Sequence, residues 1–158
     1  MVWTRFTMSS TPVDDLLREN AALQRRIAQL ERVVSIVEAS SEAIVAMALD
    51  DTLVSWNAAA ERLYGFTAAE AIGRSHLELV PFDRLAEHAT AVERALRGEP
   101  VVLETRRRRD DGSEVVVVVT YARLAEPSGK LLGLSTIAHA RAPADVASAV
   151  TDTAAGTR

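Results

Sequence analysis

Few side chains in this chain have types and spacings that could do chemistry. There are three histidines and no cysteine, which excludes disulfides, thiolate metal sites and thiol nucleophiles. His88 stands out because it lies on an apolar stripe with helical spacing, formed by Leu85, Ala89, Val92 and Leu96. No spacing of histidine, aspartate and serine suggests a hydrolase, so we expect a binding protein and not an enzyme.

The second polar feature is the basic run Arg106–Arg109 at the end of an expected hairpin strand. We interpret it as a solvated strand end, with contact to an anion or an acidic partner as the alternative. The net charge of -4 gives no general attraction to nucleic acid or to an anionic membrane. Seven aromatic residues are too few for a base-stacking surface.

A helix with heptad spacing precedes these features. Thr11 and Asp14 can form a capping box around Pro12, which suits the first helical position. Apolar positions then alternate four and three residues apart, and they are Val13, Leu16, Asn20, Leu23, Ile27, Leu30, Val34 and Val37. Branched residues at the a positions, leucine at d and one buried asparagine at a favour a parallel two-stranded coiled coil. The alternative is an amphipathic helix that packs on its own domain.

Turn and cap signals divide the rest of the chain into short elements. Asp50-Asp51 predicts a turn between two apolar strands, and Asn57 can cap a short helix that ends at Gly65. Thr67 and Glu70 form a second capping box. Further along, Asp83 can cap a longer helix over about 84–97, Asp111-Gly112 predicts a hairpin, and the last strand covers 131–138.

Five consecutive valines, residues 115–119, make both faces of one hairpin strand apolar. A sheet face without a covering layer is normally polar. We therefore expect the outer face of the sheet to be covered by the N-terminal helix or by a second subunit.

The order of these signals resembles the PAS domain family over roughly residues 40–138. The residues that carry the resemblance are Trp56-Asn57, Ala60-Glu61, Leu63 to Phe66, Glu70 to Arg74, Gly98-Glu99, Arg109 to Ser113 and Leu132-Gly133. The resemblance implies an α+β PAS fold, in which a five-stranded antiparallel sheet is flanked by short helices. It also implies a sensor and dimerisation module, and it places Val116 and Val118 on the outer face of the sheet. His139-Ala140-Arg141 replaces the Asp-Ile-Thr sequence that usually leads into an output helix.

The family often holds a small ligand between sheet and helices. The resemblance, with the strand alternation, places there Trp56, Leu85, His88, Val92, Leu103, Val117, Val119, Tyr121 and Leu134. Mostly apolar walls favour a small apolar ligand, and a filled core without ligand is the alternative. His88 falls where haem-binding relatives carry their iron ligand, but Leu103 replaces their distal arginine. Flavin-adduct chemistry is excluded by the missing cysteine, and the cofactor is otherwise unknown.

We therefore expect a disordered N-terminus over 1–10, a coiled-coil dimerisation helix over 11–38, a PAS sensor domain over 40–139 and a flexible tail over 140–158. No apolar run has the length of a membrane span or a signal peptide, which predicts a cytoplasmic protein. The predicted function is to relay ligand or redox state, through a homodimer, to a separate kinase or transcriptional regulator. The rival functions are a haem-based sensor using His88 and a ligand-free scaffold.

Overall fold

The computed structural model describes residues 11–141. The residues 1–10 and 142–158, which include the expected disordered N-terminus and most of the expected tail, lie outside this range. The chain divides into two compact units, Met1–Ser40 and Ser41–Arg158. Each unit is described by itself.

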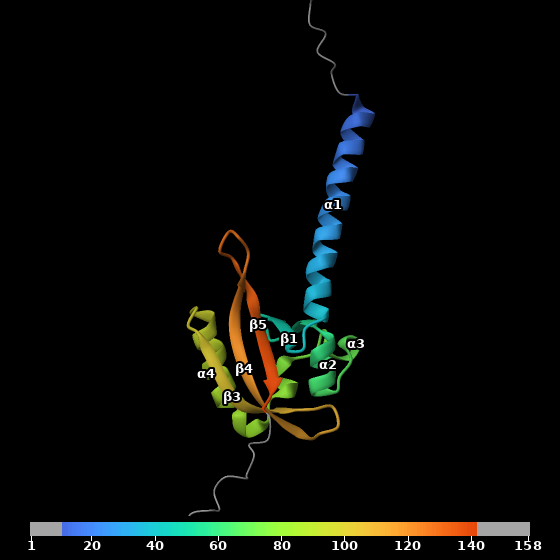
Figure 1. Ribbon diagram of the computed structural model, residues 1–158. Coiled ribbons are helices and arrows are strands. Elements are labelled where there is room, and N and C mark those ends of the chain that lie inside the picture. Colours follow the sequence, from blue (N-terminus) through green and yellow to red (C-terminus); the bar gives the residue numbers. More distant parts are fainter. Residues whose placement is uncertain (1–10, 142–158) are drawn as a thin grey trace, which may run out of the picture. The chain divides into compact units, whose positions relative to one another are not determined.

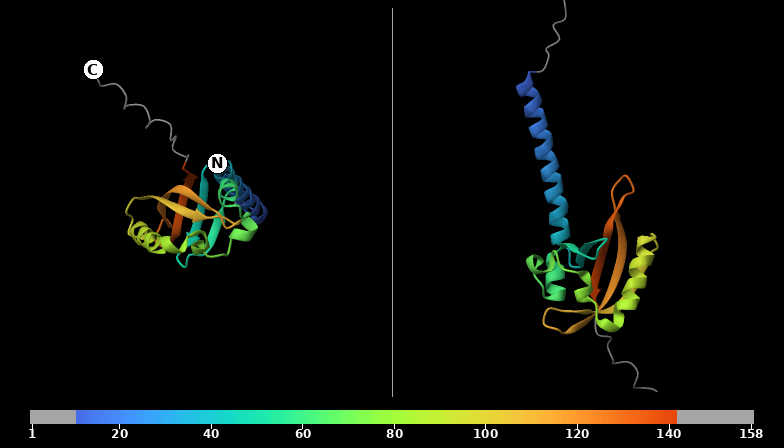
Figure 2. Two further views of the ribbon diagram at one scale, coloured as in Figure 1. Left: turned by 90° about the horizontal axis from the view of Figure 1, so that it is seen from below. Right: turned by 180° about the vertical axis from the view of Figure 1, so that it is seen from behind.

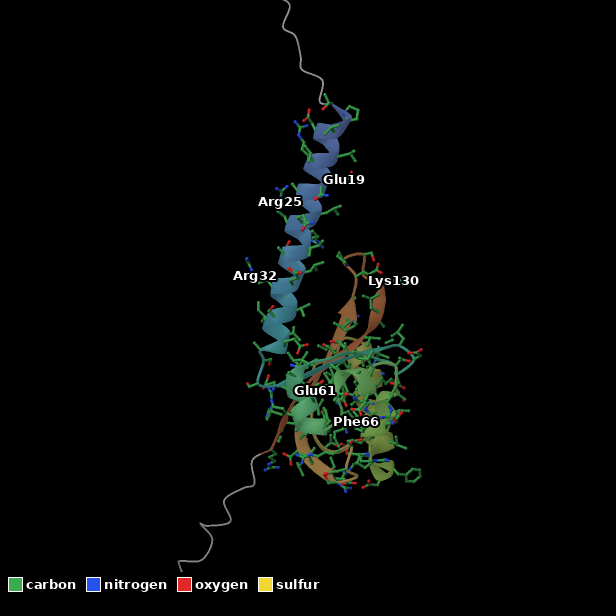
Figure 3. The ribbon with its side chains drawn as sticks, turned by 90° about the vertical axis from the view of Figure 1, so that its right-hand side faces the viewer. Glu19, Arg25, Arg32, Glu61, Phe66 and Lys130 are labelled. Carbon is green, nitrogen blue, oxygen red and sulfur yellow. The ribbon has the colours of Figure 1, made fainter. Side chains whose placement is uncertain are left out.

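In the first unit, the described residues 11–40 contain one helix, α1 (Pro12–Glu38). It begins at the predicted capping box, in which the Asp14 amide donates to the Thr11 hydroxyl and the Asp14 carboxylate accepts from Thr11. None of its side chains is buried. Figure 3 shows Arg25 and Arg32 on one side of this helix, at the f positions opposite the predicted seam. Within residues 11–141, no helix combines the length and apolar character needed to cross a bilayer.

The second unit is built on a five-stranded antiparallel sheet, which confirms the expected fold class (Figure 1). Its strands are β1 (Ala43–Ala48), β2 (Leu53–Trp56), β3 (Val101–Arg108), β4 (Glu114–Ala125) and β5 (Leu131–Ala140), in the order β2-β1-β5-β4-β3. The last strand runs two residues beyond the expected end, because Val118 and Val117 of β4 still pair with His139 and Ala140. Figures 1 and 2 show the β4–β5 hairpin, with Lys130 near its tip in Figure 3, projecting beyond the rest of the sheet.

Short helices connect β2 to β3. They are α2 (Ala58–Tyr64), α3 (Ala68–Ala71), the 3-10 turns η1 (His76–Leu79) and η2 (Phe82–Arg84), and α4 (Leu85–Leu96). Asn57 caps the N-terminus of α2, as the sequence predicted. Thr67 and Glu70 form the predicted capping box at the start of α3. The cap predicted at Asp83 is wrong. Asp83 lies inside η2 and its carboxylate pairs with Arg106, so α4 begins without a side-chain cap.

Asn57 joins α2 to the start of the sheet. Its side-chain oxygen accepts from the amides of Ile44 and Ala60 at 3.0 and 2.9 Å, and its amide nitrogen donates to the Glu42 carbonyl at 3.0 Å. The residue is completely buried. These bonds satisfy backbone groups at the N-terminus of α2 and the first residues of β1, so one side chain fixes both elements.

The core lies on one face of the sheet, beneath α2 and α4. Strand alternation places there Ala43, Val45 and Met47 of β1, Val117, Val119 and Tyr121 of β4, and Leu134, Thr136 and Ala138 of β5. The backbone of β1 lies close to β5 at Gly133, where a Cβ atom would lie 2.0 Å from the carbonyl oxygen of Met47. Gly133 pairs with Ala48, and only glycine fits this position.

Candidate functional site

The most unusual feature of the core is a buried arginine. Arg107 is 1% exposed and is the largest of the fully buried side chains. The interpretation of the whole Arg106–Arg109 run as a solvated strand end is therefore wrong for this residue. Arg106, its neighbour, faces outward and pairs with Asp83 and Glu114. The reason is the period of two along β3, which places Arg107 on the same inner face as Val101, Leu103 and Thr105.

Arg107 meets Tyr121 in the middle of this face. Its Nη2 atom donates to the Tyr121 hydroxyl at 2.6 Å, and its Nη1 atom donates to the Arg106 carbonyl at 3.1 Å. In the ladder Tyr121 stands opposite Val101, which precedes Arg107 by six residues along β3. Both side chains therefore extend toward each other over the sheet. Among residues 11–141, no carboxylate forms an ion pair with Arg107.

A guanidinium in this position is costly. Burying a charge without a counter-ion is strongly unfavourable, and the penalty after relaxation is still several kcal/mol. The carboxylate whose field reaches Tyr121 belongs to Glu87 of α4, but it pairs with Arg84 at 2.9 Å. Arg107 thus supplies the core with positive charge that these residues leave uncompensated.

Two buried histidines complete the polar centre. His88 of α4 lies with its Nδ1 atom 3.1 Å from the Tyr121 hydroxyl. The His76 ring, from η1, stacks on the His88 ring at a centroid distance of 4.9 Å. Within the described residues, His88 Nε2 and His76 Nδ1 are buried without a hydrogen-bond partner. The sequence pattern had indicated no role for His76.

The hydrogen-bond pattern assigns the tautomer of His88. Arg107 has only donors, so the Tyr121 oxygen accepts from it. The hydroxyl hydrogen of Tyr121 then needs an acceptor, and His88 Nδ1 is the atom within reach. It follows that the ring proton of neutral His88 is on Nε2. The chain of bonds runs from Arg107 through Tyr121 to His88 and ends in an N–H group with no acceptor.

The electrostatics agree with this assignment. Burial, and then the positive charge of Arg107, lower the pKa of His88 from 6.5 to about 4. Burial holds the pKa of His76 well below its usual range, and the neighbouring His88 and Arg107 lower it further. Burial also raises the pKa of Tyr121, against the opposing effect of Arg107. At neutral pH both imidazoles and the phenol are therefore uncharged, and Arg107 is the charge of the centre.

An open groove of about 500 Å³ runs beside this centre. It is lined by Leu85, His88, Ala89, Val92, Glu93 and Leu96 of α4, together with Leu77 of η1 and Asp51 of the β1–β2 turn. The helical stripe predicted from the sequence thus lines the groove. The face of α4 buried in the core carries His88, Ala91 and Ala95, whose two alanines let the helix approach the sheet closely.

The predicted pocket residues divide between the core and the groove. Trp56, Val117, Val119, Tyr121 and Leu134 are buried in the core, while Leu85 and Val92 line the groove and Leu103 is half-buried on β3. His88 belongs to both. The structure adds Arg107 and His76, which the sequence analysis missed. Counting alternate residues from Leu103 would have indicated Arg107, whereas no sequence signal pointed to His76.

The same hydrogen bonds test whether His88 could ligate the iron of a haem group. An iron on Nε2 would require the ring proton of His88 on Nδ1, donating to the Tyr121 oxygen. The Tyr121 hydroxyl hydrogen would then have no acceptor among the described residues. The residues present do not fit an iron-ligating His88.

The residues predicted for dimerisation are accessible in the single chain. The a and d positions of α1 from Val13 to Val34 are all exposed, Leu16 for example by 65%, and Val37 is partly buried. On the outer sheet face Val116 is 41% exposed and Val118 is half-buried. Their role in dimerisation stays a prediction.

The comparisons with known proteins agree with the fold. A family model described as PAS fold matches residues 37–142. Phytochrome C of Oryza sativa subsp. indica is 25% identical over 135 residues, which cover 82% of this chain and 12% of that protein. The chain thus spans about an eighth of the length of this curated relative.

Two solved structures share the architecture. A PAS domain from Colwellia psychrerythraea superimposes with a TM-score of 0.67 at 20% identity, covering 71% of this chain and 96% of that one. A PAS domain from a two-component sensor histidine kinase gives 0.64 at 12% identity, covering 73% and 99%. The chain belongs to the PAS domain family, whose model matches residues 37–142.

Proposed function

We propose that this chain is a dimeric cytoplasmic sensor module. Its PAS domain detects a small ligand or a redox change, and α1 forms a parallel coiled coil that transmits the change to a separate kinase or transcriptional regulator. Val116 and Val118 on the outer sheet face supply a second contact between the subunits. This activity is one of binding and relay, with no catalytic step.

The observation that carries the proposal is the apolar seam of α1. Leu16, Leu23, Ile27, Leu30 and Val34 follow heptad spacing on a 27-residue helix that buries none of its side chains. A helix in a protein gains most of its stability from packing its apolar face against another element. A second copy of the same helix is the occupant that fits, because Asn20 at an a position pairs with itself across a parallel two-stranded seam.

The test is the oligomeric state of the full chain by light scattering at micromolar concentration. We expect a dimer, and we expect Leu23→Glu with Leu30→Glu to give monomers, because two carboxylates from each chain would enter the seam. Ala28→Glu, at a b position outside the seam, is the matched control and should remain dimeric. A monomeric parent chain, or a dimer that survives the seam substitutions, would contradict the proposal.

A further inference from the structure

The polar centre and the groove together indicate what kind of ligand this domain would take, and this inference rests on its proposed sensory function. We propose that the groove beside α4 binds a small organic acid, with the carboxylate at His88 and the apolar body along Leu85, Val92 and Leu96. His88, Tyr121 and Arg107 are the recognition residues.

The position of the ligand carboxylate follows from the chain of hydrogen bonds that ends at His88 without an acceptor. Arg107 donates to Tyr121 at 2.6 Å, and Tyr121 donates to His88 at a distance of 3.1 Å. His88 is 2% exposed and is one of the residues that line the groove, and its Nε2 atom is buried without a hydrogen-bond partner within residues 11–141. Each donor in such a chain is polarised by the one behind it. An anionic acceptor at Nε2 would therefore complete the chain and compensate the buried guanidinium.

The body of the ligand follows from the rest of the groove. Apart from His88, the α4 stripe and Leu77 offer aliphatic surface, in a volume of about 500 Å³. Ligand sites of about 300–1,000 Å³ with mostly apolar walls and few polar groups are typical of small-molecule binding. A short aliphatic chain or an aromatic ring fits this surface better than a sugar or a peptide.

The charge of the ligand is limited by the other polar residues in the groove. Asp51 and Glu93 also line it. Glu93 pairs with Arg97 at 2.8 Å, so the carboxylate of Asp51 is the group that disfavours a guest with a second negative charge. A phosphate monoester carries nearly two charges at neutral pH, so it suits the groove less well than a monocarboxylate. The inferred class is therefore a monocarboxylic acid with an apolar body.

The test is calorimetric titration of the full chain with octanoate, benzoate and dodecanoate, each below its micellar concentration. We expect saturable binding of at least one acid. For an acid that binds, the matched alcohol and the matched dicarboxylate, 1-octanol and suberate for octanoate, should bind roughly tenfold more weakly or worse. If none of the three acids shows saturable binding, or if the alcohol binds as tightly as the acid, the inference is wrong.

Variants locate the site. Arg107→Met keeps an unbranched side chain but removes the guanidinium and its charge, and Tyr121→Phe removes one hydroxyl. Each should weaken acid binding by roughly tenfold or more, whereas Arg123→Met, an exposed arginine on β4, should leave it unchanged. Circular dichroism checks the fold, and Arg107→Met decides the result if Tyr121→Phe is unfolded. Equal affinities for Arg107→Met and Arg123→Met would overturn the assignment.

Light scattering on the same samples separates this inference from the proposed function. A dimer that fails to bind acids leaves the dimeric module standing and refutes the ligand class. A monomer that binds acids through Arg107 supports the ligand class and refutes the dimeric module.

Discussion

The rings of His76 and His88 stack with their planes 26° apart and their centroids 4.9 Å apart. Both are buried beside Arg107, so neither ring can gain a proton at low cost. The pair therefore makes the stability of the fold depend on pH.

The free energy of unfolding should fall between about pH 7 and pH 5. In the unfolded chain a histidine gains its proton near 6.5, whereas in the folded chain the pKa of His88 is lowered to about 4 and the pKa of His76 is held well below 6.5. Between these values the unfolded state binds more protons, so acid favours it. The loss should approach about 1.4 kcal/mol per pH unit for each histidine, measured by urea unfolding.

Two variants check the source of this dependence. His88→Gln should remove about half of the slope, because one of the two imidazoles is gone. His139→Gln, an exposed residue on β5, should keep the full slope. A parent protein with constant stability over this range would show that the two histidines are not held neutral.

Tyr121→Phe should destabilise the fold by about 1–3 kcal/mol, because it leaves the Nη2 group of a buried guanidinium without its acceptor. Arg107→Met should be neutral or stabilising, because a charge without a counter-ion is replaced by an apolar side chain of similar size. In the double variant the cost of Tyr121→Phe should shrink, which a double-mutant cycle by urea unfolding measures. A loss of several kcal/mol for Arg107→Met alone would mean that the guanidinium is well compensated.

Asn20→Leu should raise the melting temperature of the dimer and broaden its oligomeric distribution. A buried asparagine at an a position lowers stability but selects the two-stranded parallel state. Thermal melts and light scattering of the full chain measure both effects. Ala22→Leu, at a c position, is the control and should change neither, and a single sharp species for Asn20→Leu would argue against a seam through residue 20.

Val116→Asp should weaken the dimer while leaving the single domain folded. Val116 is 41% exposed in the single chain, so a carboxylate there costs the domain little, about 0.5 kcal/mol. In a covered apolar surface the same carboxylate would be strongly unfavourable. Sedimentation at several concentrations gives the dimer affinity, with Lys130→Asp near the hairpin tip as control. Equal affinities would show that this sheet face is open to water.

Protein expressed with added haem precursor should stay colourless. Iron on His88 would break the proton arrangement that links it to Tyr121 and Arg107. His88→Ala should then behave as a modest core truncation in thermal melts. A stoichiometric Soret band that disappears in His88→Ala would reverse this conclusion.

The elements that the sequence predicted well are those whose signals are local. Asn57 and the Thr67–Glu70 pair contact groups three residues away, so their types and spacing are sufficient to predict helix starts. The expected strands follow from turn signals of the same range, whereas the five-stranded sheet was expected from the resemblance to the PAS family. Asp83 was misjudged because a long-range partner, Arg106, competes for its carboxylate.

The candidate site was harder to predict, because its contacts join distant parts of the chain. His88 and Tyr121 are 33 residues apart, and Arg107 and Tyr121 are 14 apart. Arginine is rarely buried without a counter-ion, so its residue type argued for the surface although its strand position argued for the interior. On α4, residue size decided the orientation. Ala91 and Ala95 face the sheet, and the larger Leu85, Val92 and Leu96 line the groove.

The close approach of β5 to β1 at Gly133 affects which substitutions would survive in a mutant library of this domain. Any side chain there would meet the Met47 carbonyl oxygen, so almost every substitution would be lost from a library selected for folding. A position so intolerant looks like a recognition residue, although it touches no groove and carries no chemistry. Arg107 would show the opposite profile, because its replacement by methionine should pass a selection for folding and fail one for ligand binding. Selecting the same library twice, first for folding and then for binding, would separate the two kinds of position.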